Sequence, residues 1–245
     1  MSGRDFLVVP NGQEDDIVIT CDSIGGIGGL SGDFLSVDPS VVGHFLARVA
    51  LMELLAAGGE LVALSCTFAI NEQDAAPILK GVFAEARHVH PYPERITIVT
   101  TEKNIPTVQT GVGITCIGKA KDGVRTGLSR IGDVVLAVGN PKVGALVKLT
   151  DTEIADIPLL RRLLAQPGIR DVAPAGSKGI LYEAQAMAEA AKLRLQCSSD
   201  SSILHKSAGP ATAIAFSCDP AAVATIEDTF ANLVAIGVFK EGANT

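Results

Sequence analysis

Three carboxylates stand at positions where secondary structure alone gives no reason for an acid. Asp22 ends a β-branched run, Glu53 interrupts the apolar stretch 50–57, and Glu102 follows a second β-branched run. A glutamate on a buried helix face carries a large desolvation penalty unless it is paired or bound to a cation. Magnesium prefers a few carboxylates together with water and substrate phosphates. Acids from separate elements would therefore suit one or two magnesium ions that handle a phosphorylated substrate.

Each of these carboxylates also has a purely structural explanation. Asp22 could form a turn, and Glu102 could be a solvated charge in a loop. Glu53 could lie on an exposed stripe of its helix, which Arg48 and His44 would partly share. The sequence leaves these alternatives open, because the position of each side chain decides between them.

A glycine-rich loop, Ser-Ile-Gly-Gly-Ile-Gly-Gly, follows Asp22 directly. Gly25, Gly26 and Gly28 would let backbone amides approach phosphate groups closely. The spacing is not that of a Walker loop, since no Gly-Lys-Ser/Thr follows, and glycine content alone is weak evidence. The loop is nevertheless predicted to bind phosphates, while a metal ion would offset the charge of a transferred phosphoryl group.

A second candidate anion site is Ser177-Lys178-Gly179, which opens a predicted helix over residues 180–192. Amides at a helix N-terminus together with a lysine attract anions, although simple helix capping would use the same residues. Asn104 could contact a phosphate or a ribose, or merely shape the turn that follows Glu102.

Short β-branched runs alternate with amphipathic segments along the chain, which indicates an α/β or α+β fold. The predicted strands cover residues 6–9, 17–21, 61–68, 96–100, 112–117, 134–138, 169–172, 193–197, 212–216 and 233–238. The predicted helices cover residues 38–57, 74–88, 158–164, 180–192 and 221–231. The polar stretch 121–130 predicts a boundary between an N-terminal domain, residues 1–130, and a C-terminal domain, residues 131–245.

The order of these features resembles that of one superfamily. A strand ends in Asp-x-x-Gly, a Pro-initiated helix carries an acid before Ala-Gly-Gly, and a strand, a helix and another strand lead to Thr-Glu. This order is similar to that of the aminoimidazole ribonucleotide synthetase-like (PurM-like) superfamily over nearly the whole chain. Its members include thiamine-monophosphate kinase, selenophosphate synthetase and a hydrogenase maturation factor that dehydrates a carbamoyl group.

Within the superfamily, the motifs are most similar to those of α-ribazole kinase and its relatives. The shared motifs are Cys-Asp-x-x-Gly-x-Ile-Gly at residues 21–28, Met-Glu at 52–53 and Thr-Thr-Glu-x-Asn at 100–104. The resemblance implies that the γ-phosphate of ATP is transferred to a ribosyl 5′-hydroxyl in cobamide salvage. The small-molecule acceptor would then be α-ribazole.

The resemblance also implies roles for individual residues. Asp22, Glu53 and Glu102 would hold Mg²⁺ and the phosphates of ATP. The protein would be a homodimer in which the N-terminal mixed-sheet domains pair into a barrel, with ATP near that interface and an α/β sandwich as the C-terminal domain. Asp171 falls in a segment similar to a second-domain acidic motif, and we predict it as the general base. Lys178 departs from the pattern, because kinases of the thiamine branch have an acid there.

Composition limits the remaining partners. The formal net charge is −7 and no basic run is present, so nucleic acid is not an expected partner. The five cysteines are far apart and form no Cys-x-x-Cys pair, which favours reduced thiols. We expect a cytoplasmic protein, because the N-terminus lacks a secretion signal. No membrane span is expected either, because no uncharged apolar run reaches about 18 residues.

Three functional hypotheses follow. The first is an ATP-dependent small-molecule kinase, which would accumulate a phosphorylated product. The second is an ATP-driven ligase or dehydratase of the same superfamily, in which phosphate activates an amide or carboxyl group. The third is a nucleotide-binding homologue without catalytic activity, which Lys178 in place of an acid would favour.

Overall fold

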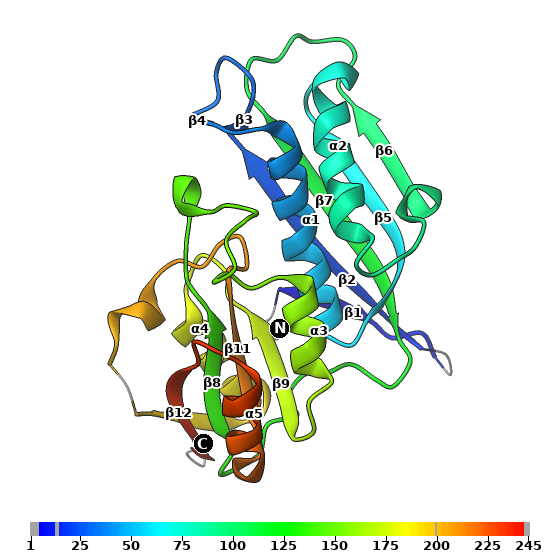
Figure 1. The fold of residues 1–245 in the computed structure, drawn as a ribbon. Helices are drawn as coiled ribbons and strands as arrows, with labels where there is room; N and C mark the ends of the chain where they lie inside the picture. The colour runs from blue at the N-terminus through cyan, green and yellow to red at the C-terminus, as the bar shows by residue number, and fades with distance from the viewer. Residues whose placement is uncertain (1–4, 13–14, 199, 243–245) are drawn as a thin grey trace. The chain divides into compact units, whose positions relative to one another are not determined.

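A computed structural model describes residues 5–12, 15–198 and 200–242 of the chain. These residues divide into two compact units, one from Asp5 to Val124 and one that begins at Arg125. The division falls between Val124 and Arg125, whereas the sequence predicts the boundary between residues 130 and 131. Each unit has its own sheet and helices (Figure 1).

The N-terminal unit is built on a mixed five-stranded sheet in the order β1-β2-β7-β5-β6. Its strands are β1 (Phe6–Val9), β2 (Asp16–Gly25), β5 (Glu60–Phe68), β6 (Thr97–Thr101) and β7 (Gly111–Ala120). β5 and β6 are parallel, whereas the other neighbouring strands are antiparallel. The predicted strands of this half are confirmed, although β2 and β7 extend beyond their predicted ends. A two-residue parallel pairing of β3 (Ile27–Gly28) with β4 (Leu35–Ser36) was not predicted.

Two helices, α1 (Pro39–Ala56) and α2 (Glu72–Ala86), cover one face of this sheet (Figure 1). α1 begins where the sequence predicts, because the Asp38 side chain accepts a hydrogen bond from the Ser40 amide. Length and composition alone would let α1 cross a membrane. However, 61% of the helix is buried inside the protein, as a core helix is.

The two helices approach so closely that their backbones touch at two glycines. A β-carbon on Gly43 would lie 1.8 Å from the carbonyl oxygen of Ile78. A β-carbon on Gly81 would lie 2.0 Å from the carbonyl oxygen of Ser40. No other residue type fits at either position without a shift of one helix, so these glycines set the separation of α1 and α2.

The C-terminal unit is built on an antiparallel five-stranded sheet in the order β10-β12-β8-β11-β9. Its strands are β8 (Val134–Gly139), β9 (Ile169–Pro174), β10 (Leu193–Cys197), β11 (Ala213–Cys218) and β12 (Val234–Glu241). Its helices are α3 (Ile157–Leu164), α4 (Ile180–Ala190) and α5 (Val223–Thr229). The elements match the predicted ones, except that α5 is shorter.

Both faces of the central strands in this unit are buried. α4 packs on one face, where Ala184 and Met187 lie in a core with Ala137, Ala215 and Phe239. The opposite face is also closed, and its buried residues are Leu136, Val138, Ile214 and Phe216. Burial on both sides agrees with the sandwich expected for this domain.

Candidate functional site

Asp22 lies in β2 on the face of the sheet that α1 covers. Alternation along the strand places it on the same face as Thr20, whose hydroxyl donates a 2.7 Å hydrogen bond to the carbonyl oxygen of Ala50 in α1. Burial raises the pKa of the Asp22 carboxyl to about 6, although a hydrogen bond from the backbone of Ser23 lowers it. Asp22 is therefore a half-buried acid whose charge is poorly solvated, and a bound cation would relieve that penalty.

Glu53 is half-buried in the last turn of α1. α1 runs antiparallel to β2, because Pro39 at its start packs next to Gly29, which follows the end of β2. A β-carbon on Gly29 would lie 3.2 Å from the Pro39 ring. The hydrogen bond between Thr20 and Ala50 joins β2 to α1. Relative to this bond, Asp22 lies toward the N-terminal end of α1, and Glu53 lies toward its C-terminal end.

One structural alternative placed Arg48 and His44 partly on the same exposed stripe of the helix as Glu53. The structure does not support this alternative. Arg48 and His44 both bind Glu85 of α2, with the Arg48 Nε at 2.8 Å and the His44 Nδ1 at 3.0 Å from its carboxylate. Glu85 is 2% exposed. Burial alone would raise the pKa of Glu85, but hydrogen bonds from His44 and Arg48 outweigh it and hold the pKa below the usual value. This buried acid was missed by the sequence analysis.

Glu102 follows β6 and caps its own turn. Its Oε1 accepts hydrogen bonds from the backbone amides of Asn104 (2.7 Å) and Ile105 (3.1 Å). These bonds, the one from Asn104 foremost, hold the pKa of Glu102 below its usual range. One carboxylate oxygen is thus engaged by the turn, and Asn104 shapes that turn through its backbone.

The three predicted metal ligands are not gathered into one cluster. Within residues 5–12, 15–198 and 200–242, no group of three or more His, Cys, Asp or Glu side chains could hold a metal ion. Asp22, Glu53 and Glu102 lie on three different elements. Magnesium is commonly held by one or two carboxylates, with water and substrate phosphates completing its shell. Asp22 fits such a site as a single protein ligand.

The glycine-rich loop is closed by hydrogen bonds to the segment that precedes β7. The Gly26 amide donates to the Thr110 carbonyl oxygen at 2.8 Å, and the Gly32 amide donates to the Val108 carbonyl oxygen at 2.7 Å. Gly26 has a φ of +69°, and a β-carbon on Gly28 would lie 2.4 Å from the Thr110 hydroxyl oxygen. The Gly26 amide therefore already has an acceptor in this conformation, while Gly25 is the last residue of β2.

Asp33 is a residue of this loop that the sequence analysis missed. Its carboxylate accepts hydrogen bonds from the Leu30 amide (2.8 Å), the Thr110 amide (2.7 Å) and the Thr110 hydroxyl (2.7 Å). Burial would raise the pKa of Asp33, but these hydrogen bonds outweigh burial and hold the pKa below its usual value. The only sequence signal was an Asp beside a glycine in a polar turn, which is common in loops of every kind.

Ser177, Lys178 and Gly179 lead directly into α4, as predicted. Gly179 has a φ of +85°, and no side chain caps the helix start. The Lys178 ammonium donates a 3.0 Å hydrogen bond to the Tyr182 hydroxyl and lies 4.2 Å from the centroid of that ring. The basic side chain is therefore folded along its own helix, next to amides that no side chain caps.

The structure gives Asp171 a structural role in place of the predicted general base. Its side chain is 0% exposed, and its carboxylate accepts hydrogen bonds from the amides of Gly127 (2.9 Å) and Val172 (3.1 Å). A general base must reach the acceptor hydroxyl directly or through one water. An enclosed carboxylate with these partners instead holds the segment around Gly127 against β9.

Comparison with known proteins places this fold. No family model matches the chain, and no curated protein matches it. Thiamine-monophosphate kinase from Aquifex aeolicus is a similar solved structure, with a TM-score of 0.64 and 14% identity, and the match covers 97% of this chain and 89% of that one. The hydrogenase maturation protein HypE of E. coli has a TM-score of 0.63 and 13% identity over 94% of this chain and 81% of that one.

T. maritima PurL, solved with ADP, has a TM-score of 0.61 and 12% identity over 97% of this chain and 42% of that one. The chain therefore has the fold shared by thiamine-monophosphate kinase, HypE and PurL, which supports the aminoimidazole ribonucleotide synthetase-like fold expected from its motifs. Two of these relatives were solved with nucleotides, namely A. aeolicus thiamine-monophosphate kinase with AMPPCP and PurL with ADP.

Proposed function

We propose that the protein is an ATP- and Mg²⁺-dependent kinase that transfers the γ-phosphate to a hydroxyl of a small molecule. The observation that carries the proposal is the environment of Asp22. This carboxylate is half-buried next to the glycine-rich loop, and its pKa is raised to about 6 by burial. Likeness of fold to a kinase solved with an ATP analogue and a second ligand supports the same reading.

Asp22 would hold the magnesium ion, which when bound neutralises charge on the phosphates. Glu53 and Glu102 lie on other elements, so a metal ion or metal-bound water that either of them held would be separate from the one at Asp22. Gly25 would leave room for phosphate oxygens to approach the backbone, whereas the Thr110 hydroxyl and the Asp33 carboxylate fill the corresponding space at Gly28. The chain itself would supply positioning and charge stabilisation, which carry most of the rate in phosphoryl transfer.

The acceptor would be α-ribazole, phosphorylated on its ribosyl 5′-hydroxyl. The motifs at residues 21–28, 52–53 and 100–104, which resemble those of α-ribazole kinase, support this choice. Ser177, Lys178 and Gly179, at the uncapped start of α4, would bind an anionic group of a substrate. The buried Asp171 is not assigned a part in the reaction.

Phosphorus NMR of the protein with ATP, Mg²⁺ and α-ribazole tests the proposal, with thiamine monophosphate as a parallel acceptor. A new phosphomonoester signal together with ADP is expected with α-ribazole, and its loss is expected in Asp22→Asn. ATP hydrolysis without a stable phosphorylated product would instead indicate a ligase or dehydratase. Nucleotide binding without turnover for either acceptor would contradict the kinase proposal and favour a non-catalytic homologue.

We also propose that the protein is a homodimer that pairs through its N-terminal sheets. Within the N-terminal unit, no described helix covers the sheet face opposite α1 and α2 (Figure 1). That face carries Leu7, which pairs with Ile19, and Ile98, which pairs with Ser65. Leu7 is 59% exposed and Ile98 is 70% exposed. A second copy placed face to face would bury these side chains in a barrel.

Analytical ultracentrifugation tests the dimer. Ile98→Glu would place a charge on the exposed face of the edge strand β6, within the proposed interface, and should give a monomer. Ile105→Glu is the matched control, because Ile105 is 68% exposed and lies in the loop after β6, outside the sheet. A monomeric wild type, or an Ile98→Glu variant that stays dimeric, would refute this interface.

A further inference from the structure

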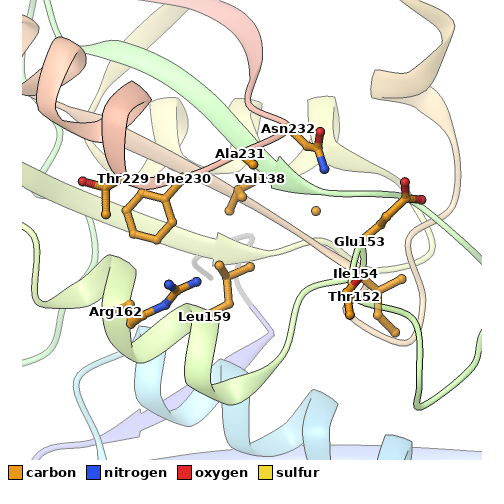
Figure 2. A pocket seen from close by; sticks show the side chains of 11 residues that line it. Val138, Thr152, Glu153, Ile154, Leu159, Arg162, Thr229, Phe230, Ala231 and Asn232 are labelled. Atoms are coloured by element: carbon orange, nitrogen blue, oxygen red, sulfur yellow. The ribbon is translucent and has the colours of Figure 1, made fainter.

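The C-terminal unit contains a pocket that the proposed kinase site does not use. Its volume is about 280 Å³. It opens beside the end of β8, between α3 and the turn that follows α5 (Figure 2). Its lining includes Val138, Glu153, Ile154, Leu159, Arg162 and Asn232. Three separate chain segments thus build one cavity.

One end of the pocket is formed by a cation and an aromatic ring. Arg162 extends from α3, and its guanidinium carbon lies 5.5 Å from the centroid of the Phe230 ring. Phe230 is 4% exposed, so the ring is fixed in the core while the exposed guanidinium remains on the pocket wall. Among the residues that the structure describes, Arg162 forms no ion pair with an acid. Its five N–H donors are therefore available to an anion.

The other end of the pocket is polar, and neighbouring groups partly compensate the negative charge of its one carboxylate, Glu153. Asn232 and Glu153 lie together at this end, away from Arg162 (Figure 2). The Glu153 carboxylate accepts hydrogen bonds at 3.2 Å from the Lys142 ammonium and at 3.2 Å from the Asn140 side chain. Its charge is therefore partly compensated before any ligand arrives.

Asn232 stands at the edge of the pocket, where its side chain projects (Figure 2). It has a φ of +58°, a left-handed conformation that asparagine adopts more readily than most residues other than glycine. Its side-chain amide can both donate and accept a hydrogen bond.

The wall between these two ends is partly apolar. Val138, which is 3% exposed, lies opposite Leu159 of α3, and Ile154, which is 5% exposed, lies on the same side as Leu159 (Figure 2). An apolar wall with a few convergent polar groups is the usual composition of a small-molecule site. The volume is at the small end of such sites, which suits an aromatic acid better than a nucleoside triphosphate.

We propose that this pocket binds a small organic carboxylate with an apolar or aromatic body. The carboxylate would pair with the guanidinium of Arg162, whose planar fork matches a carboxylate in two hydrogen bonds. The body of the ligand would lie against Val138, Ile154 and Leu159, and a polar substituent would reach Asn232. The site is distinct from the proposed kinase site, because none of the residues that line it is assigned to that site.

Benzoate is a suitable probe, since it combines a carboxylate with an aromatic ring. Amide chemical shifts of the full-length, ¹⁵N-labelled protein would be followed during titration. The expected result is a saturable shift of the amides of Gly139, Ile154 and Asn232. Benzamide, a neutral molecule of the same shape, should bind at least about tenfold more weakly, because it lacks the charge-assisted hydrogen bonds. Acetate, which lacks the ring, should also bind more weakly.

Arg162→Gln should weaken benzoate binding at least about tenfold. Arg161→Gln is the matched control, since Arg161 lies on the same helix and does not line the pocket. An unchanged affinity in Arg162→Gln, equal binding of benzamide, or shifts confined to other parts of the protein would each overturn the proposal. Arg162 is exposed, so the variant should fold, and the dispersion of its amide spectrum verifies this.

Discussion

The carboxylate of Asp33 accepts two hydrogen bonds from Thr110, one from the backbone amide and one from the hydroxyl, each at 2.7 Å. Asp33 and Thr110 are far apart in the sequence, and their hydrogen bonds join the glycine-rich loop to the segment before β7. Gly26 lies within the same junction, because its amide donates to the carbonyl oxygen of Thr110. We therefore expect the conformation of the predicted phosphate loop to depend on the hydrogen bonds of this one acid.

Asp33→Ala should loosen the glycine-rich loop while the rest of the N-terminal unit stays folded. Loss of charge-assisted hydrogen bonds should lower the local free energy of opening by about 1 to 3 kcal/mol. Hydrogen exchange of residues 26–36 measures this effect. Because the folded pKa of Asp33 is lowered, its stabilisation is present at neutral pH and is lost as the pH falls through that pKa.

Asp38→Asn is the control for this experiment, since Asn caps helices as well as Asp does. Exchange in residues 26–36 should match the wild type in this variant. Equal protection of the loop in Asp33→Ala and in the wild type would show that the Asp33–Thr110 contact does not hold the loop.

Much of the fold could be predicted from the sequence, because local signals and burial agree. The helix start at Asp38-Pro39 and the β-branched run at 17–21 both led to elements that the structure contains. The pairing of β3 with β4 could not be predicted, since each strand has only two residues and no periodicity to detect. The contact between Asp33 and Thr110 beside this pairing could not be predicted either, because the two residues are brought together only by the folded chain.

The candidate site was predictable only in part, for a related reason. An acid within apolar sequence is visible, and Asp22 and Glu53 were found in this way. The partners of an acid are not visible when they lie on another element. Arg48 is partnered by Glu85 because α1 and α2 cross at close range, and that distance is set by contacts of Gly43 and Gly81 with the facing backbone.

Gly43→Ala should destabilise the N-terminal unit strongly, because the new methyl group would lie 1.8 Å from the Ile78 carbonyl oxygen. The two helices would have to separate, and overpacking of a packed core typically costs about 1 to 3 kcal/mol. Gly111→Ala is the matched control, since its β-carbon would lie at an ordinary contact distance of 3.4 Å from Ala69. Urea unfolding monitored by circular dichroism should separate the two variants, and similar midpoints would contradict the close helix contact.

Glu85→Gln should lower the free energy of unfolding by about 3 to 5 kcal/mol, because it removes the buried carboxylate that Arg48 and His44 bind. Arg48 is 6% exposed, so water cannot replace that partner well. The folded pKa of Glu85 is lowered, so the wild type should lose this stabilisation as the pH falls below the range in which glutamate is usually ionised. Urea unfolding at neutral and acidic pH tests both statements. The exposed Glu72 of the same helix, changed to Gln, should have little effect.

Asp22→Asn should stabilise the protein at neutral pH while it removes activity. The folded pKa of Asp22 is raised from 3.8 to about 6, so the folded state binds its proton more tightly than the unfolded state. The contribution of Asp22 to the free energy of unfolding is therefore fully present below pH 3.8 and is lost as the pH rises through about 6. The shift corresponds to at most about 3 kcal/mol, and partial contact with solvent reduces this to about 1 to 2 kcal/mol.

The free energy of unfolding of the wild type and of Asp22→Asn would be compared at about pH 8 and at about pH 4. The variant should be more stable than the wild type at about pH 8, and the difference should disappear at about pH 4. Mg²⁺ should stabilise the wild type at the higher pH and leave Asp22→Asn unchanged, because the ion would relieve the charge that burial penalises. Asp122→Asn, at an exposed position, is the control for a general charge effect. A less stable Asp22→Asn at about pH 8 would mean that the fold uses the charged form of Asp22 and that burial is not its dominant influence.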